Sequence, residues 1–130
     1  MRRWIVDGNN VYGSRPDGWW RDRAAAAARL VEEVGRWQQQ GGDDVTVVFD
    51  GGRPEALTPS DPPRVTVAFA RDEGAGSADD LIVRLVGAPG GPLTVVTSDR
   101  GLVARLPLGV AVEGAGSFLR RLVDGAGPEP

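Results

Sequence analysis

Residues 2–10 read RRWIVDGNN, a short apolar run that ends in an aspartate, a glycine and two asparagines. Trp4, Ile5 and Val6 form the run, and polar residues interrupt it at once, which favours a strand over a signal peptide. In an open α/β sheet, ligands bind at the carboxyl ends of the strands. We therefore predict a strand at 3–7 that brings the carboxylate of Asp7 to a functional edge.

Three further segments place acids in comparable positions. The run VTVVFD ends at Asp50 and the run LTVVTSD ends at Asp99, while SADDLIVRL opens a predicted helix with Asp79 and Asp80. Carboxylates gathered on one edge of a sheet repel one another unless a cation neutralises them. Hard cations such as Mg²⁺ take oxygen ligands, so the pattern predicts a divalent-metal site.

Apolar runs alternate with helical stretches along the chain, which is typical of βαβ units around a parallel sheet. The pattern predicts strands at 3–7, 45–49, 64–70, 93–97 and 110–112, helices at 19–40, 78–86, 99–106 and 117–123, and irregular loops at 8–18 and 51–63. The fold class is thus α/β, a five-stranded sheet with helices on both faces. The 130 residues suit one domain, which we place at 1–124, before a flexible C-terminal tail at 125–130.

The composition excludes several classes of site. The chain contains no cysteine and no histidine, which excludes disulfides, thiolate metal sites, a Ser-His-Asp triad and a histidine general base. Any metal must be held by oxygen. The net charge of −3 is not that of a strongly basic nucleic-acid binder, although all 15 basic residues are arginine, whose planar fork suits phosphate. No apolar run approaches the roughly 20 residues of a membrane span, and a cytoplasmic protein is expected.

Asp7 and Asp50 each have a functional and a structural interpretation. Asp7 could cap the loop after its strand as an Asx turn, or it could be a metal ligand. In the second case Asn9 or Asn10 would bind a substrate phosphate or orient a ligand. Asp50 is followed by two glycines and fits a plain turn, so we rank it as a peripheral member of the group.

Asp99 follows a buried strand and precedes a predicted helix. It could be the N-cap of that helix, a role that Ser98 could also take. As a metal ligand it would be supported by Thr97 and Ser98, whose hydroxyl groups can bond the carboxylate or a bound water.

Asp79 and Asp80 open the helix predicted at 78–86. Acids stabilise a helix N-terminus by about 0.3–1 kcal/mol each without any further function. Neighbouring helical residues point about 100° apart, so at most one of the two faces a site squarely. Asp80 can pair with Arg84 at the i,i+4 spacing, which leaves Asp79 as the better ligand.

The group predicts hydrolysis of a phosphodiester without a protein nucleophile. A divalent cation lowers the pKa of a bound water and stabilises the charge that develops on the phosphate. Trp19 and Trp20 could stack on unpaired bases. Arginines near the same edge could contact a phosphate backbone; they are Arg15, Arg21, Arg23, Arg53, Arg71 and Arg100.

With these residues in place, the chain resembles the NYN domain family of PIN-like ribonucleases, most closely its YacP-like branch. The resemblance rests on IVDGNNV at 5–11, VVFDG at 47–51, SADDLI at 77–82 and VVTSDRGL at 95–102. It implies a PIN-like three-layer α/β/α sandwich whose mainly parallel sheet has the order 3-2-1-4-5. It also implies metal-dependent RNA cleavage with Asp7, Asp79 and Asp99 as core ligands, and Asn10 matches the family's asparagine. In the strand order that the resemblance implies, Asp7 and Asp99 each end a central strand at the switch point of the sheet, so they rank first among the acids.

One position departs from the family pattern. PIN-like enzymes often carry a further acid two residues after the position of Asp99, where this chain has Gly101. The departure favours one metal ion over two. A haloacid-dehalogenase-type phosphatase is disfavoured, because Asn9 stands where its second acid is required and the chain has no lysine.

The sequence therefore predicts a Mg²⁺- or Mn²⁺-dependent endoribonuclease acting on single-stranded or structured RNA. The predicted metal and catalytic residues are Asp7, Asp79 and Asp99, ahead of Asp80 and Asp50, and the predicted substrate contacts are Asn9, Asn10, Ser98 and Arg100. The alternative is a catalytically weak or inactive RNA-binding module of the same fold in an RNA-processing complex. The sequence leaves open whether the chain forms a homodimer or joins RNA-processing proteins.

Overall fold

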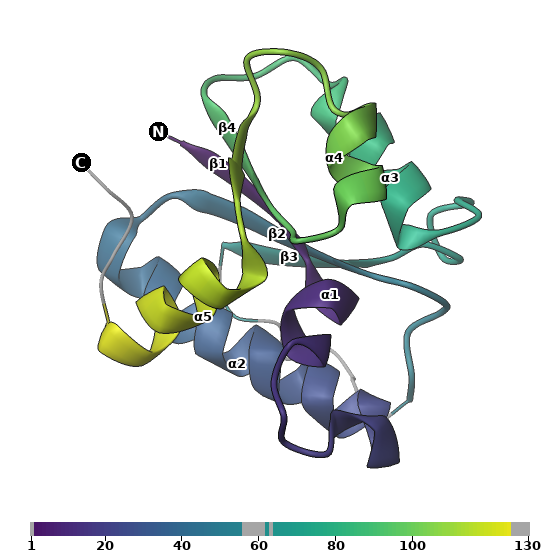
Figure 1. The fold of residues 1–130 in the computed structure, drawn as a ribbon, viewed down its shortest axis with the longest axis vertical. Helices are drawn as coiled ribbons and strands as arrows, with labels where there is room; N and C mark the ends of the chain where they lie inside the picture. Colours follow the sequence, from purple (N-terminus) through teal and green to yellow (C-terminus); the bar gives the residue numbers. More distant parts are fainter. Residues whose placement is uncertain (1, 56–61, 63, 126–130) are drawn as a thin grey trace.

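The sheet is the centre of the computed structural model, which describes residues 2–55, 62 and 64–125 (Figure 1). Its five strands are β1 (Arg3–Asp7), β2 (Asp44–Phe49), β3 (Val65–Phe69), β4 (Leu93–Val96) and β5 (Ala111–Glu113). They pair in the order β3-β2-β1-β4-β5, and every pairing is parallel. The predicted fold class and strand order are confirmed. β2 and β3 lie on one side of β1, whereas β4 and β5 lie on the other, so the strand order switches sides between β1 and β4. Open α/β sheets bind ligands at such a switch point.

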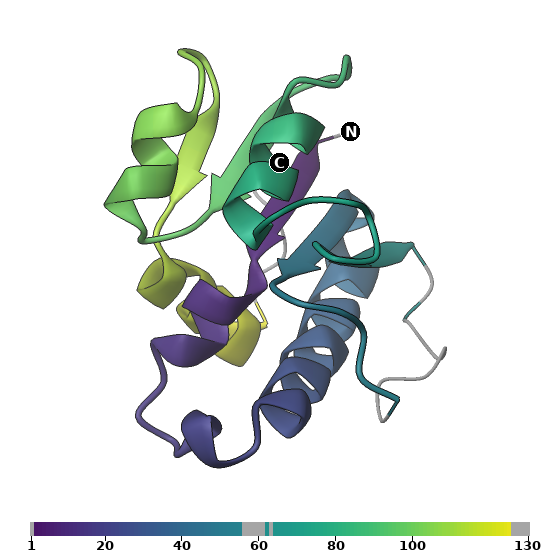
Figure 2. The same ribbon diagram turned by 90° about the vertical axis from the view of Figure 1, so that its right-hand side faces the viewer.

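Helices cover both faces of this sheet. They are α1 (Gly8–Gly13), α2 (Arg23–Gly41), α3 (Ala78–Val86), α4 (Arg100–Arg105) and α5 (Ala115–Asp124), with a 3₁₀ turn, η1, at Trp19–Arg21. Figures 1 and 2 show α1, α2 and α5 on one face and α3 and α4 on the other. The result is the three-layer sandwich that the sequence predicts.

Alternation along β1 divides the apolar core between the two faces. Trp4 and Val6 join the cluster under α2 and α5, whereas Ile5 joins the cluster under α3 and α4. Trp4 is 1% exposed and packs edge-on against Trp37, with ring centroids 5.1 Å apart, and both rings contact Phe118. Both tryptophans are core residues.

The structure differs from the predicted elements at two places. The predicted loop at 8–18 begins with a helix, α1, whose Val11 and Tyr12 are buried against the core. The helix predicted at 19–40 is interrupted at Asp22, whose side chain caps α2 by accepting a 3.0 Å hydrogen bond from the amide of Ala25. Elsewhere the predicted strands and helices agree within two residues.

Two predicted segments fall partly outside the described residues. The loop predicted at 51–63 is described at 51–55 and at 62, and the tail predicted at 125–130 only at Gly125. Among the described residues, no helix has the length and apolar character that crossing a membrane requires.

Gly8 joins β1 to α1 and lies against the end of β2. A Cβ atom at this position would overlap the ring of Phe49 and lie 2.9 Å from the carbonyl oxygen of Val48. We expect Gly8→Ala to lower the free energy of unfolding by about 1–3 kcal/mol, because the backbone of β2 cannot give way. Urea unfolding followed by tryptophan fluorescence measures the change.

Gly13→Ala is the matched control at the other end of α1. There the nearest atoms to a new Cβ belong to Trp19 at 3.8 Å, an ordinary contact. We expect little change in stability. Equal losses in the two variants would show that the close approach at Gly8 does not constrain the junction.

Candidate functional site

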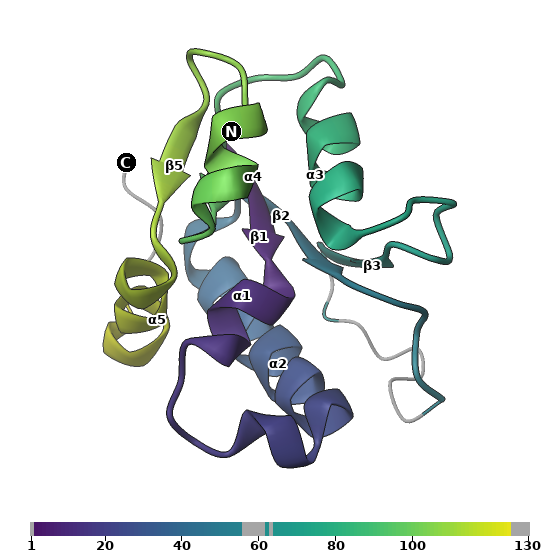
Figure 3. The same ribbon diagram turned by 45° about the vertical axis from the view of Figure 1, so that its right-hand side comes forward.

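The four predicted acidic positions lie at the carboxyl edge of the sheet. β1 ends at Asp7, Asp50 follows β2, and Asp99 follows β4 through two residues. Asp79 lies in the first turn of α3, which starts at the same edge (Figure 3). The ionisation of Asp7 is disfavoured by the charges of both Asp79 and Asp99, so these three carboxylates share one electrostatic environment. We refer to Asp7, Asp79 and Asp99 as the aspartate group.

Asp7 is the most buried member of the aspartate group. Only 4% of it is exposed, and its Oδ2 accepts a 2.8 Å hydrogen bond from the hydroxyl of Thr97. Burial raises its pKa from 3.8 to about 6; the charges of Asp79 and Asp99 add to the rise, while Thr97 and the backbone of Asn10 oppose it. A buried carboxylate with a raised pKa in such a position is typical of a functional site.

Asp99 combines the two roles that the sequence offered it. As N-cap of α4, its Oδ1 accepts from the amides of Gly101 at 2.8 Å and Leu102 at 3.2 Å. Its own amide donates to the hydroxyl of Thr97 at 3.0 Å. Because Thr97 bonds both Asp7 and Asp99, one buried hydroxyl fixes the two strand ends relative to each other.

Asp79 is half-buried, and its pKa is raised. Burial is the largest cause, and the charges of Asp99, Asp50 and Asp80 act in the same direction. The guanidinium of Arg105 opposes them. Arg105 is a site residue that the sequence did not reveal, since it lies on α4, far along the chain from Asp79.

Asp80 and Asp50 have structural contacts. Asp80 pairs with Arg105 at 2.9 Å, so the predicted pair with Arg84 is wrong; Arg84 instead donates to the carbonyl of Glu73 at 2.8 Å. The rotation of the helix turns Asp80 toward α4 rather than along its own surface. Asp50 is exposed, and its Oδ1 accepts from the amide of Ala78 at 2.7 Å, which fixes the start of α3.

Asn9, Asn10 and Ser98 join neighbouring loops at this edge. Oδ1 of Asn9 accepts from the amide of Asp50 at 2.7 Å, and Oδ1 of Asn10 accepts from the amide of Ser98 at 2.8 Å. The hydroxyl of Ser98 in turn accepts from the amide of Ala115 at 2.8 Å. These bonds hold the ends of β1, β2 and β4 in one arrangement, so two asparagines of α1 and the serine after β4 position the site.

The predicted arginines fall into two kinds. Arg15 forms a 2.8 Å ion pair with Glu33, and Arg53 donates to the carbonyl of Val67 at 3.0 Å, so both stabilise the fold. Arg21, Arg23, Arg71 and Arg100 have exposed side chains. Of the predicted phosphate contacts, these four are placed to meet a ligand from solution.

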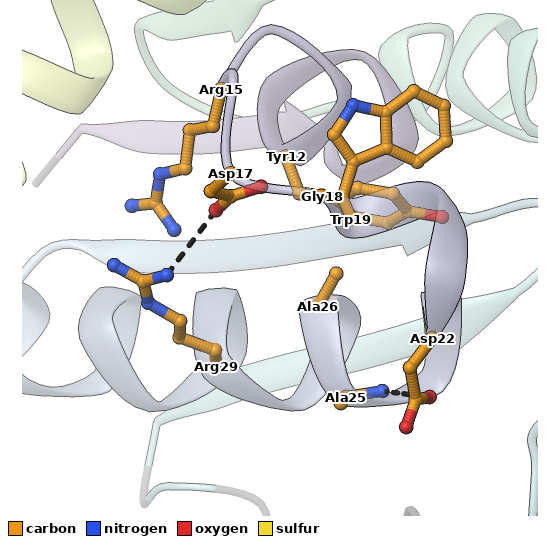
Figure 4. Close-up of a pocket in the computed structure, with 9 residues that line it drawn as sticks. All are labelled: Tyr12, Arg15, Asp17, Gly18, Trp19, Asp22, Ala25, Ala26 and Arg29. Atoms are coloured by element: carbon orange, nitrogen blue, oxygen red, sulfur yellow. Dashed lines mark hydrogen bonds and ion pairs between the residues drawn. The ribbon is translucent and has the colours of Figure 1, made fainter.

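The two tryptophans of η1 also differ. Trp19 packs on Tyr12, with ring centroids 5.7 Å apart, beside a cavity of about 200 Å³ between η1 and α2. Figure 4 shows this cavity, where Arg29 faces Asp17 at 3.2 Å. Trp20 is 57% exposed and meets Trp19 edge-on. Trp19 is half-buried, so Trp20 presents more of its ring to solvent for stacking.

The donor set of the aspartate group consists of oxygen atoms alone, which suits Mg²⁺ or Mn²⁺. Burial is the main cause of the raised pKa of Asp7 and Asp79, and a cation among these carboxylates would relieve the repulsion that adds to it. Within the part of the chain that the structure describes, however, no three acidic side chains are arranged closely enough to hold a metal ion as they stand. The residues therefore fit a divalent cation in chemistry, and side-chain rotation must complete the ligand set.

Thr97→Val tests how strongly the shared hydroxyl controls the site. We expect the pKa of Asp7 to rise further above 6, because the bond from Thr97 is the largest influence that lowers it. Loss of the same hydroxyl leaves the amide of Asp99 without its acceptor, at a cost of about 1–3 kcal/mol. An NMR titration of the carboxyl carbons measures the pKa. Thr94→Val, at a buried threonine in β4, the strand that Thr97 follows, should leave the pKa unchanged; a shift in both variants would contradict the assignment.

Comparison with known proteins agrees with the fold and with the sequence motifs. The family described as the YacP-like NYN domain matches the chain over residues 4–106. A crystal structure of Rae1 (YacP) from Bacillus subtilis, of a point mutant, is 25% identical, covers 96% of this chain and 77% of its own, and superposes with a TM-score of 0.74. A second crystal structure of the same protein is 24% identical and gives a TM-score of 0.73. That match covers 96% of this chain and 75% of the other. No curated protein matches the sequence.

Proposed function

The chain belongs to the YacP-like NYN domain family, and from that premise we propose that it is a metal-dependent endoribonuclease. The family has a PIN-like ribonuclease fold, and such nucleases generally depend on divalent metals. The observation that carries the proposal is the aspartate group, three mutually repelling carboxylates at the switch point of the sheet. The substrate is RNA, and Mg²⁺ or Mn²⁺ is the cofactor.

Asp7, Asp79 and Asp99 would hold the cation. When bound, the cation lowers the pKa of water and stabilises negative charge on the phosphodiester. The chain's own contribution is positional. Thr97 orients Asp7, and the amides of α4 fix Oδ1 of Asp99, which leaves its other oxygen as the ligand atom. Since the pKa of Asp7 is about 6, this carboxyl is mostly ionised at pH 7 and mostly protonated at pH 5.

The substrate contacts divide by exposure. Asn9 and Asn10 keep the loops of the site in place; Asn9 donates one amide hydrogen to Tyr12 and keeps one for an RNA phosphate, and Asn10 can offer its amide hydrogens to the same group. Arg100 is exposed at the start of α4, directly after Asp99, and Ser98 is exposed on its other side. We assign a phosphate contact to Arg100, because its guanidinium can bind two oxygens of one phosphate.

Labelled RNA with Mn²⁺ tests the proposal. Wild-type protein should cleave it, whereas Asp7→Asn and Asp79→Asn should each reduce the rate by more than about 100-fold, beyond the 10–100-fold typical of residues that only support ligands. Asp44→Asn, an exposed aspartate at the start of β2 and away from the carboxyl edge, is the control and should cleave normally. Cleavage that survives in both site variants would place the activity in a contaminant or at another site.

The alternative function is that of an RNA-binding module. It is supported by the spacing of the side chains in the aspartate group, which are too far apart to hold a metal ion as they stand in the described residues. Because they do not form a closed ligand set among the described residues, and Gly101 stands where related enzymes often carry an acid, the domain could bind RNA with little or no catalysis. The same experiment separates the two functions. RNA binding without cleavage at any Mn²⁺ concentration would support the binding module.

A further inference from the structure

A second cavity opens beside the aspartate group, on the other side of Asn9. Its volume is about 280 Å³, and it lies between α1, the first turns of α2 and the carboxyl ends of β2 and β3. Pockets for drug-sized ligands usually measure about 300–1,000 Å³. This cavity therefore suits a ligand fragment of one or two rings.

The floor of the cavity is aromatic and rigid. It includes Tyr12, Phe49 and Phe69, each no more than 4% exposed. Phe49 stacks on Phe69 with ring centroids 5.2 Å apart, and Tyr12 lies 6.2 Å from Phe49. Because these rings already pack on one another, the cavity cannot collapse by rotating them. A flat apolar ligand meets a preformed wall, which limits the entropy lost on binding.

One wall of the cavity is shared with the candidate active site. Asn9 accepts from the amide of Asp50 and donates to the hydroxyl of Tyr12 at 2.9 Å, and all three residues line the cavity. Asp50 also bonds the amide of Ala78, the residue before Asp79. A ligand held here lies one loop away from the aspartate group, so it can be part of the same substrate.

The rim of the cavity carries both kinds of polar group that a nucleotide needs. Arg23 lines the cavity, and its guanidinium lies 5.4 Å from the ring centroid of Trp19 next to it. Arg71 does not line the cavity but lies near Gly52, which does: a Cβ on Gly52 would lie 3.7 Å from Nη1 of Arg71 and 3.4 Å from Oδ1 of Asp72. Cations at the rim suit phosphates of the backbone, while the carboxylate of Asp50 can accept from the amino or imino groups of a base.

We propose that this cavity receives one unpaired base of an RNA strand whose neighbouring phosphate lies at the aspartate group. The proposal rests on the proposed function and adds a base-binding subsite to it. A single base fits the volume, the apolar floor and the charged rim together. A duplex does not, because its bases are stacked and paired and cannot enter a pocket of this depth without unpairing.

The alanine run at the start of α2 provides a matched pair of variants. Ala24 lines this cavity, whereas its neighbour Ala25 is exposed and lines the cavity of Figure 4 instead. Ala24→Phe should fill the proposed subsite, and Ala25→Phe adds the same ring to the same helical turn outside it. Circular dichroism and thermal melting of both variants confirm that they fold.

The test measures the affinity of a short, labelled single-stranded RNA by fluorescence anisotropy in EDTA, where metal-dependent cleavage cannot occur. A series of the same RNA lacks one base at a time. For wild-type protein, we expect removal of one particular base to weaken binding about tenfold, the scale of a single stacked base. In Ala24→Phe the intact RNA should bind about tenfold more weakly, and removal of that base should have no further effect; Ala25→Phe should behave as wild type.

The outcomes separate this proposal from the ribonuclease proposal. The subsite is overturned if base removal weakens binding equally in wild type and in Ala24→Phe. It is also overturned if removal of no base weakens binding. Either result counts even if the protein cleaves RNA with Mn²⁺. A sensitive position that Ala24→Phe abolishes, in a protein that never cleaves, would support the subsite and overturn the ribonuclease. If Ala24→Phe fails to fold, Ala24→Leu, a smaller side chain at the same position in the cavity, takes its place in the comparison.

Discussion

Asp7→Asn is expected to raise the free energy of unfolding of the metal-free protein at pH 7 by about 2–3 kcal/mol, although it removes a residue of the proposed active site. The pKa of Asp7 is raised from 3.8 to about 6 on folding, and each unit corresponds to about 1.4 kcal/mol. An asparagine avoids the cost of a buried charge. Its amide oxygen can still accept the hydrogen bond from Thr97, whose hydroxyl is the donor to Asp7.

The pH dependence of stability identifies the cause of this gain. A carboxyl whose pKa is higher in the folded state favours folding while it is protonated. That contribution is complete below pH 4 and is lost as the pH rises through about 6. Wild type should therefore lose stability relative to Asp7→Asn between pH 4 and 6, and the difference should be constant above pH 7. Urea unfolding of both proteins at each pH measures this difference. If the free energy of unfolding changed with pH in the same way in both proteins, a raised pKa for Asp7 would be contradicted.

Mn²⁺ should reverse the order of the two proteins. An ion that binds only the folded state raises its stability in proportion to the logarithm of its concentration. We expect Tm to rise with millimolar Mn²⁺ for wild type and for the Asp44→Asn control, and to stay constant for Asp7→Asn. An equal rise in all three would show that the ion binds elsewhere on the protein.

Trp4→Ala is expected to cost about 3–5 kcal/mol, a large part of the 5–15 kcal/mol that stabilises a typical domain. The side chain lies in the middle strand and is packed against Trp37 and Phe118. Its indole Nε1 also donates to Oδ2 of Asp43 at 3.1 Å, so the variant removes a hydrogen bond along with the packing. Thermal and urea unfolding should both report the loss.

Trp20→Ala is the matched control for that substitution. Trp20 is 57% exposed on η1, and surface substitutions usually change stability by no more than about 0.5 kcal/mol. A loss close to that of Trp4→Ala would mean that η1 contributes to the core more than its exposure indicates. A small loss in stability together with weaker RNA binding would instead support a stacking role for this ring.

The sheet was predictable because its strands have a strong local signal. The β-branched runs ending at Phe49 and Val96 are buried on both faces, as expected for strands of a parallel sheet. The helix Ala78–Val86 was predicted with its observed bounds, because Ser77 caps it and Gly87 follows it. Each of these features lies within a few residues of the element that it defines.

The errors arose where distant contacts override the local signal. Gly8, Asn9 and Asn10 read as a turn, yet α1 forms because Val11 and Tyr12 are buried against the sheet and α2. The partner of Asp80 is Arg105, 25 residues away, rather than the helical neighbour Arg84. The aspartate group itself was predicted from strand ends, but how its side chains are held depends on hydrogen bonds between loops that no local pattern specifies.

The hydrogen bonds between loops also determine when the site can form during synthesis of the chain. Thr97 follows Asp7 by 90 residues, and Ser98 follows Asn10 by 88. The first aspartate therefore leaves the ribosome long before the residues that orient it. A central strand whose neighbours come from both halves of the sequence cannot be completed until β4 has been made. On the proposed function, a partly synthesised chain would carry no RNA-cutting activity until β4, Thr97 and Ser98 had been made and could fold against β1.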